Sequence, residues 1–136
     1  MEGPVLAMRA ALHDAGISSR QIGYINAPGT GTPTNDPVET RAIRELFGSH
    51  ANRLAVSSTK SLHGHALGAA GALEAVSTIL ALREGLIPPP ANFIAPDPEC
   101  DLDVVPNRAR PAQVEFALSN AVAFGGLNAV LAFRAC

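Results

Sequence analysis

Apolar residues recur along this chain with two spacings, one typical of helices and one typical of strands. Near the N-terminus, Val5, Met8, Leu12 and Ala15 lie three or four positions apart. This spacing predicts a helix with one apolar face. Gly16 follows directly and suits the end of such a helix, because glycine adopts the left-handed conformation found just past helix ends.

Positions 21–57 predict two strands separated by a second helix. Residues 21–27 (QIGYINA) and 54–57 (LAVS) are short apolar runs of the kind that form buried strands. Between them, Asp36 followed by Glu39 three residues later resembles a capping box, so we expect a helix to begin at Asp36 and to stop at Gly48. Its inner face is predicted to contain Val38, Ala42, Ile43 and Leu46.

A third helix is predicted from Ala66 to Arg83, and it is apolar around nearly its whole circumference. The segment is slightly too short to cross a membrane, and it has Glu74 near its middle. We therefore interpret it as a central helix buried in protein, and we expect no association with a membrane.

The C-terminal part predicts a long loop followed by two strands. Residues 91–110 are rich in Asp and Pro and read as a loop, with one short strand near 102–105. Strands are expected at 114–121 and 127–134. The order of helices and strands then indicates a layered α/β fold with a mixed sheet, and we expect residues 1–136 to form a single domain.

Composition narrows the classes of function. Hydrophobic residues make up 47% of the chain and charged residues 16%, which is typical of a globular protein with more apolar surface than one small domain can cover. The net charge is −2 and the basic residues are scattered, so binding to nucleic acid is not expected. Cys100 and Cys136 form neither a metal-binding pattern nor a disulfide framework. Without a recognisable export signal, a cytoplasmic protein is expected, with no cofactor and no metal.

Three features could carry chemistry. A lone Glu74 in an apolar helix needs a cation, and Lys60, which follows an apolar strand, is the nearest sensible one. Such a pair could be structural or catalytic. His65, among small residues, could exchange a proton with a substrate, or it could cap the helix that follows. Phe124, with Gly125 and Gly126, could gate a pocket or simply form a hairpin turn.

Taken together, several motifs resemble the β-ketoacyl-acyl carrier protein synthase (ketosynthase) family. They are residues 26–33 (NAPGTGTP), 56–61 (VSSTKS), 64–72 (GHALGAAGA) and 120–128 (NAVAFGGLN), in the order and spacing of that family. The resemblance covers the later half of the family's thiolase-type fold. It implies the C-terminal half of that fold.

The resemblance also implies a chemistry, the decarboxylative Claisen condensation of 3-oxoacyl-carrier protein synthesis. In the family, a cysteine from the N-terminal half carries the acyl chain, and two histidines hold the thioester carbonyl of malonyl-carrier protein. His65 matches the second histidine, Lys60 the family's lysine and Glu74 its glutamate. The positions implied for substrate binding are Thr30, Thr32, Phe124, Gly125 and Gly126.

The sequence also departs from the family pattern. Pro28 stands where the first histidine is expected, and a proline side chain has no donor. Losing one preorganised donor of this kind typically costs ~10²–10³ in rate. The nucleophilic cysteine belongs to the other half of the fold, so we expect no condensation by this chain alone. Ala123 and Leu127 replace the usual glycine and threonine of the last loop.

Three functions remain open from the sequence. The chain could be a non-condensing partner subunit, similar to a chain length factor, that pairs with a full-length ketosynthase in fatty acid or polyketide synthesis. It could be half of a split synthase whose missing N-terminal half supplies the cysteine, or a stand-alone acyl-binding or scaffolding module. It could also be a fragment of a longer synthase. An acyl carrier protein is a further expected partner.

Overall fold

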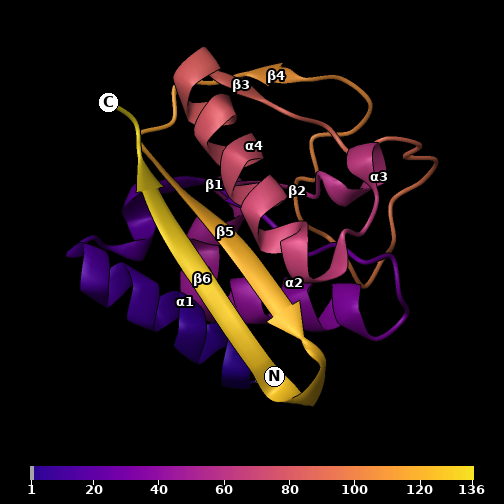
Figure 1. Cartoon of the computed structure of the whole chain (residues 1–136), viewed down its shortest axis with the longest axis horizontal. Helices are drawn as coiled ribbons and strands as arrows, with labels where there is room; N and C mark the ends of the chain where they lie inside the picture. The colour runs from indigo at the N-terminus through magenta and orange to yellow at the C-terminus, as the bar shows by residue number, and fades with distance from the viewer. Residues whose placement is uncertain (1) are drawn as a thin grey trace.

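The computed structural model describes residues 2–136, and its centre is a four-stranded mixed sheet (Figure 1). The strand order is β2 (Ala55–Ser57), β1 (Ile22–Asn26), β5 (Phe116–Ala123) and β6 (Leu127–Arg134). β1 pairs in parallel with β2 and with β5, whereas β5 and β6 form an antiparallel hairpin. The mixed sheet and these four strands confirm the sequence prediction.

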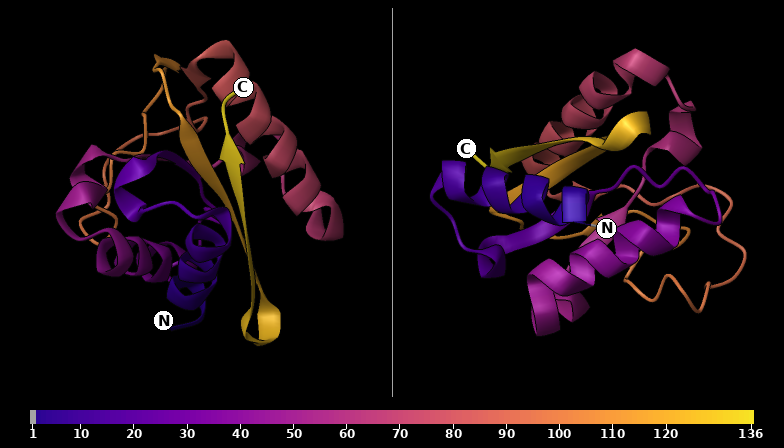
Figure 2. Two further views of the ribbon diagram at one scale, coloured as in Figure 1. Left: turned by 90° about the vertical axis from the view of Figure 1, so that its left-hand side faces the viewer. Right: turned by 90° about the horizontal axis from the view of Figure 1, so that it is seen from below.

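Helices lie on both faces of this sheet, so the fold has three layers. α1 (Glu2–Ala15) and α2 (Asn35–Phe47) cover one face, and α4 (Ala70–Glu84) lies against the other face (Figure 2). The layered α/β architecture predicted from the order of elements is therefore confirmed.

The alternation of side chains along the strands divides the core between the two faces. Ile25 and Leu118 point into a cluster beneath α1 and α2, whereas their neighbours Tyr24 and Ala117 point into a smaller cluster beneath α4. All four side chains have less than 1% exposure. The central strands β1 and β5 are consequently buried on both sides, which explains their nearly continuous apolar sequences.

The first two helices depart from the predictions in small ways. Val5, Met8 and Leu12 of α1 are buried as predicted, but Ala15 is exposed because the helix ends there and the chain turns away at Gly16. α2 begins at Asn35 rather than Asp36. On its predicted inner face, Ala42 and Ile43 are buried, whereas Val38 and Leu46 are only half-buried.

The third predicted helix begins later than expected and is buried on one side only. Leu67 has a positive φ of 50°, so residues 67–69 form a separate 3₁₀ turn and α4 starts at Ala70. One side of α4 is buried against the sheet, through Ala70, Glu74, Thr78 and Ala81. The opposite side exposes Leu73, Val76, Ile79 and Leu80. Within residues 2–136, the prediction that this helix is buried on all sides is therefore wrong.

No helix within residues 2–136 is both long enough and apolar enough to span a membrane.

The segment after α4 is mostly loop, as predicted, with two differences. No strand forms at 102–105, where only Asp103 makes an isolated bridge to Ala55. A two-stranded ribbon of β3 (Leu86–Ile87) and β4 (Arg110–Pro111) was not predicted. Strands of two residues are too short to show a periodic pattern in the sequence. The remaining short elements are η1 (Ser19–Gln21), η2 (Gly48–Arg53), α3 (Lys60–His63), η3 (Leu67–Ala69) and η4 (Phe124–Gly126).

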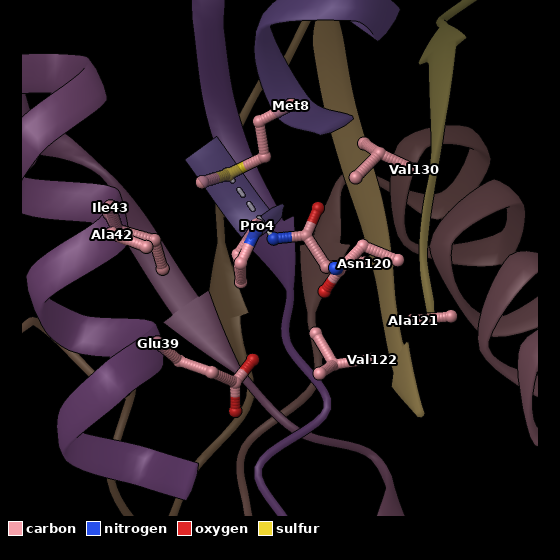
Figure 3. A pocket seen from close by; sticks show the side chains of 10 residues that line it. Pro4, Met8, Glu39, Ala42, Ile43, Asn120, Ala121, Val122 and Val130 are labelled. Carbon is pink, nitrogen blue, oxygen red and sulfur yellow. Dashed lines mark hydrogen bonds between the residues drawn. The ribbon is translucent and has the colours of Figure 1, made fainter. Parts of the chain in front are cut away.

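A small cavity of about 10 Å³ lies between α1, α2 and the β5–β6 hairpin (Figure 3). Met8, Glu39 and Asn120 are among the side chains around it, and the Asn120 amide donates to the Met8 sulfur over 3.4 Å. Asn120 Oδ1 is buried without a hydrogen-bond partner among the described residues. The cavity is thus a small gap in the core with a polar atom beside Glu39.

Candidate functional site

The predicted site residues gather at one edge of the sheet because of the strand directions. β1 is parallel to both β2 and β5, so the carboxyl ends of these three strands meet at the same edge. The loop with Thr30 and Thr32 follows β1, the loop with Lys60 and His65 follows β2, and Phe124 follows β5. Ligands of open α/β sheets commonly bind at such an edge.

Lys60 and Glu74 form a buried ion pair at this edge. Lys60 Nζ contacts Glu74 Oε1, with side-chain exposures of 8% and 1% respectively. The two residues come from α3 and α4, so the pair joins the loop after β2 to the helix on the sheet. The structure therefore brings together the pair that the sequence predicted. Its position inside the protein means that neither charge can be removed without leaving the other uncompensated.

His65 is exposed and makes one hydrogen bond with residues 2–136, and this bond decides where its proton lies. The backbone N–H of Leu67 donates to His65 Nδ1 over 3.2 Å. Since Nδ1 accepts, the proton of the neutral ring is on Nε2. His65 lies five residues before α4, so it does not cap that helix as one interpretation of the sequence suggested. The side chain therefore offers an Nε2–H donor to a group outside the described residues.

The turn at Pro28 and Gly29 is held tightly against the loop that follows β2. Pro28 is almost fully buried, and its carbonyl accepts a hydrogen bond from the Ser58 hydroxyl over 3.1 Å. Gly29 has a φ of 44°, and a Cβ there would lie 2.4 Å from Ser58 Cβ. Glycine is therefore required at position 29.

Glu39 is a buried acid that stabilises this turn. Its Oε2 accepts from the Gly29 backbone N–H over 2.9 Å and from Asn35 Nδ2 over 2.7 Å. Burial raises the pKa of Glu39 to about 7, although these two hydrogen bonds act to lower it. The capping box predicted from Asp36 and Glu39 is wrong, because Glu39 reaches back past the helix start to Gly29.

The remaining predicted residues follow strands that end at the same edge, but within residues 2–136 they form no hydrogen bond with His65 or Lys60. The hydroxyls of Thr30 and Thr32 are 3.4 Å apart, and Thr32 Oγ1 accepts the Asn35 backbone N–H. Phe124 is 101% exposed at the tip of the hairpin, and both Gly125 and Gly126 have positive φ angles. Positive φ explains why glycines occupy this turn.

A cleft of about 260 Å³ beside the turn was not predicted. It lies between α2, the end of β2 and the loop 90–104, and neither Lys60 nor His65 lines it. Glu39, Ser58 and Cys100 are among its walls, and burial raises the pKa of the Cys100 thiol. Among residues 2–136, no group of three or more His, Cys, Asp or Glu side chains is placed to hold a metal ion.

Sequence reasoning missed the polar residues that support the site. Asn26 and Thr59 are buried, and Asn26 Nδ2 donates to Thr59 Oγ1 and to the Glu74 carbonyl, both over 3.3 Å. Asn26 is the last residue of an apolar strand. A polar residue at the end of such a run was the one signal in the sequence that could have indicated its role.

The sequence and the fold of the chain both match those of known proteins. Residues 1–94 match the family model described as the β-ketoacyl synthase C-terminal domain. Nodulation protein E of Rhizobium sp. (strain N33) is 58% identical over 134 residues, which is 98% of this chain and 33% of that protein. The 3-oxoacyl-[acyl-carrier-protein] synthase 2 of Coxiella burnetii is 53% identical over 130 residues, which is 96% of this chain and 31% of that protein.

Solved structures share the same fold. A structure described as the ishigamide ketosynthase/chain length factor superposes with a TM-score of 0.95 at 43% identity, covering 99% of this chain and 33% of that one. The chain therefore belongs to the β-ketoacyl synthase family, as the resemblance implied. It corresponds to the C-terminal half of the ketosynthase fold and spans about a third of the length of the curated relatives it matches.

The Lys60–Glu74 pair predicts a large loss of stability when one partner is removed. Glu74→Ala leaves a buried ammonium, so the free energy of unfolding should fall by about 3–5 kcal/mol in chemical denaturation. Glu84→Ala is the matched control on the same helix, because Glu84 pairs with Arg83 at the exposed surface. We expect its effect to stay within about 0.5 kcal/mol. Equal small effects of both substitutions would contradict the buried pair.

The raised pKa of Glu39 predicts a specific dependence of stability on pH. Between the ordinary value of 4.5 and about 7, the folded chain binds more protons than the unfolded chain at this carboxyl. The free energy of unfolding should therefore fall as pH rises through that window, by on the order of 3 kcal/mol from this group. Glu39→Gln, which cannot ionise, should remove that part of the fall. If the free energy of unfolding changes with pH in the same way for the wild type and for Glu39→Gln between pH 4 and pH 8, the raised pKa of Glu39 is excluded.

Proposed function

We propose that this chain acts as a ketosynthase-like subunit that does not condense substrates itself, similar to a chain length factor, and that it pairs with an acyl-carrying ketosynthase. The observation that carries the proposal is the buried Pro28 at the position where the family's pattern has its first active-site histidine. A proline there removes one of the two donors that would hold a thioester carbonyl.

The local geometry supports a role of Pro28 in structure rather than in chemistry. Its ring is buried, its carbonyl is bonded to Ser58, and the next N–H is bonded to Glu39. Position 28 is thus integrated into the packing of the turn. With His65 as the single remaining donor, a loss of ~10²–10³ in rate is expected for a site of this kind.

The retained residues fit a partner subunit. The Lys60–Glu74 pair is intact and buried, so it serves the packing of α3 on α4 whether or not chemistry takes place beside it. A structure of a ketosynthase/chain length factor superposes closely on this chain, which supports a subunit of either kind.

The uncovered side of α4 supports docking onto an acyl-carrying ketosynthase. Leu73, Val76, Ile79 and Leu80 are each at least 41% exposed and follow one side of the helix. The chain spans about a third of its relatives, so in a complete ketosynthase fold more protein lies beside these elements. An apolar stripe of this kind is typical of a surface that another protein covers. We propose an acyl carrier protein as a further partner, at the edge with Thr30, Thr32 and Phe124.

A split synthase is the second candidate, and His65 favours it. The His65 side chain is exposed and its Nε2–H has no hydrogen-bond partner among the described residues, as a carbonyl donor requires, and a relative at 53% identity is a 3-oxoacyl-[acyl-carrier-protein] synthase 2. In this case the partner chain would contribute the cysteine, and His65 would hold the thioester carbonyl of the malonyl unit as decarboxylation converts it into an enolate.

The docking proposal predicts that a charge on α4 prevents assembly. Val76→Asp should weaken binding to a co-expressed ketosynthase by well over tenfold, because covering an unpaired carboxylate costs several kcal/mol. The free chain should lose less than about 0.5 kcal/mol, since Val76 is 55% exposed there. Mass in solution, measured by light scattering after co-purification, reports the complex.

Leu6→Asp is the control for this experiment. Leu6 is 57% exposed, as Val76 is, but it belongs to α1 on the opposite side of the sheet. Assembly should survive this change. If the wild-type chain is a monodisperse monomer and binds none of the candidate ketosynthases, the docking surface is ruled out.

The rate of the complex separates the two candidate functions. With acyl- and malonyl-carrier protein as substrates, His65→Ala should leave the steady-state condensation rate of the complex nearly unchanged if this chain is a non-condensing partner. A split synthase would instead lose ~10²–10³ in rate. His13→Ala, at an exposed position of α1, is the control for non-specific effects. A large loss in His65→Ala alone would replace our proposal with the split enzyme.

A further inference from the structure

His63 lies two residues before His65 and has no part in the functions considered so far. Unlike His65, it has hydrogen-bond partners at both ring nitrogens. Nδ1 is 2.9 Å from the Gly64 carbonyl oxygen, and Nε2 is 3.1 Å from Thr59 Oγ1. The ring therefore links Thr59, the residue before α3, to Gly64, the residue that precedes His65.

These two contacts determine where the protons of His63 lie. The Gly64 carbonyl can only accept, so Nδ1 must carry a proton. In the neutral ring Nε2 is then an acceptor, and the Thr59 hydroxyl donates to it. His63 and His65 thus hold opposite tautomers, Nδ1–H at position 63 and Nε2–H at position 65.

Thr59 connects His63 to the buried part of the site. Its oxygen accepts from Asn26 Nδ2, which also donates to the Glu74 carbonyl. The amide orientation of Asn26 is settled by that second bond, because its oxygen could not face another carbonyl oxygen. Thr59 is 2% exposed and Asn26 is fully buried. An uninterrupted line of hydrogen bonds therefore runs from α4 through β1 to the exposed loop.

We propose that His63, held as the Nδ1–H tautomer, is a positioning residue that fixes the Gly64–His65 loop. Gly64 has a φ of 83° and no other atoms within 4 Å of its Cβ position, so packing does not restrain it. The Gly64 N–H donates to the Lys60 carbonyl over 2.7 Å and ties the preceding peptide to α3, whereas the hydrogen bond from His63 Nδ1 holds the carbonyl of the peptide between Gly64 and His65. By fixing this peptide, His63 directs His65 and its Nε2–H outward. The inference depends on the proposed function only for the task that His65 performs.

The test is nitrogen-15 NMR of the histidine-labelled chain, with the signals assigned by single substitutions. At a pH where both rings are neutral, we expect Nδ1–H for His63 and Nε2–H for His65. In His63→Ala the backbone amide of Leu67, which donates to His65, should exchange with solvent roughly two- to tenfold faster, the loss expected for one hydrogen bond.

Conservative replacements distinguish positioning from general loss of structure. In His63→Asn the side-chain amide can still donate to Gly64, so slow exchange of the Leu67 amide should return. His63→Gln places its amide at the position of Nε2 and should not restore it. His13→Ala should behave as wild type. An Nε2–H tautomer of neutral His63, or unchanged exchange of Leu67 in His63→Ala, would overturn the proposal. The rate measurement on His65→Ala tests the proposed function separately, because the NMR outcome does not depend on catalysis.

Discussion

The buried contact between Lys60 and Glu74 is the interaction on which the site edge depends. An unpaired charge inside protein costs several kcal/mol, so each residue needs the other in place. Because Lys60 comes from the loop after β2 and Glu74 from α4, the pair fixes the helix relative to the sheet edge. Asn26 adds a bond from β1 to the Glu74 carbonyl, which places all three elements in one network.

The second constraint is that the helices on the two faces of the sheet are buried to different extents. The buried cluster beneath α1 and α2 is the larger of the two, whereas α4 is packed on one side and leaves its other side open. A helix that is apolar all round is stable in water only when protein covers it all round. The excess of apolar residues in the composition and the open side of α4 are thus one property, namely more apolar surface than the described residues cover by themselves.

Much of the fold was predictable because its signals are local. The apolar runs of β1, β2, β5 and β6 and the spacing of Val5, Met8 and Leu12 depend only on neighbours along the chain. The predictions were wrong where the backbone conformation or a partner outside the local pattern decides the structure. Leu67 has a positive φ that no periodicity reveals, so α4 began later than expected. Glu39 bonds to Gly29 across a turn, which a capping pattern cannot distinguish from a local contact.

By itself, the sequence determined the layered α/β class, the family, and the pairing of Lys60 with Glu74, since motif order, periodicity and the cost of a buried charge can all be read along the chain. Only the tertiary structure decided which atoms face which. The parallel strands bring the loops of Thr30, His65 and Phe124 to one edge, and the partners of the ring nitrogens assign the protons of His63 and His65. Tautomers and hydrogen-bond directions depend on distances between residues that are remote in sequence or turned by the backbone, and a residue pattern contains no such distances.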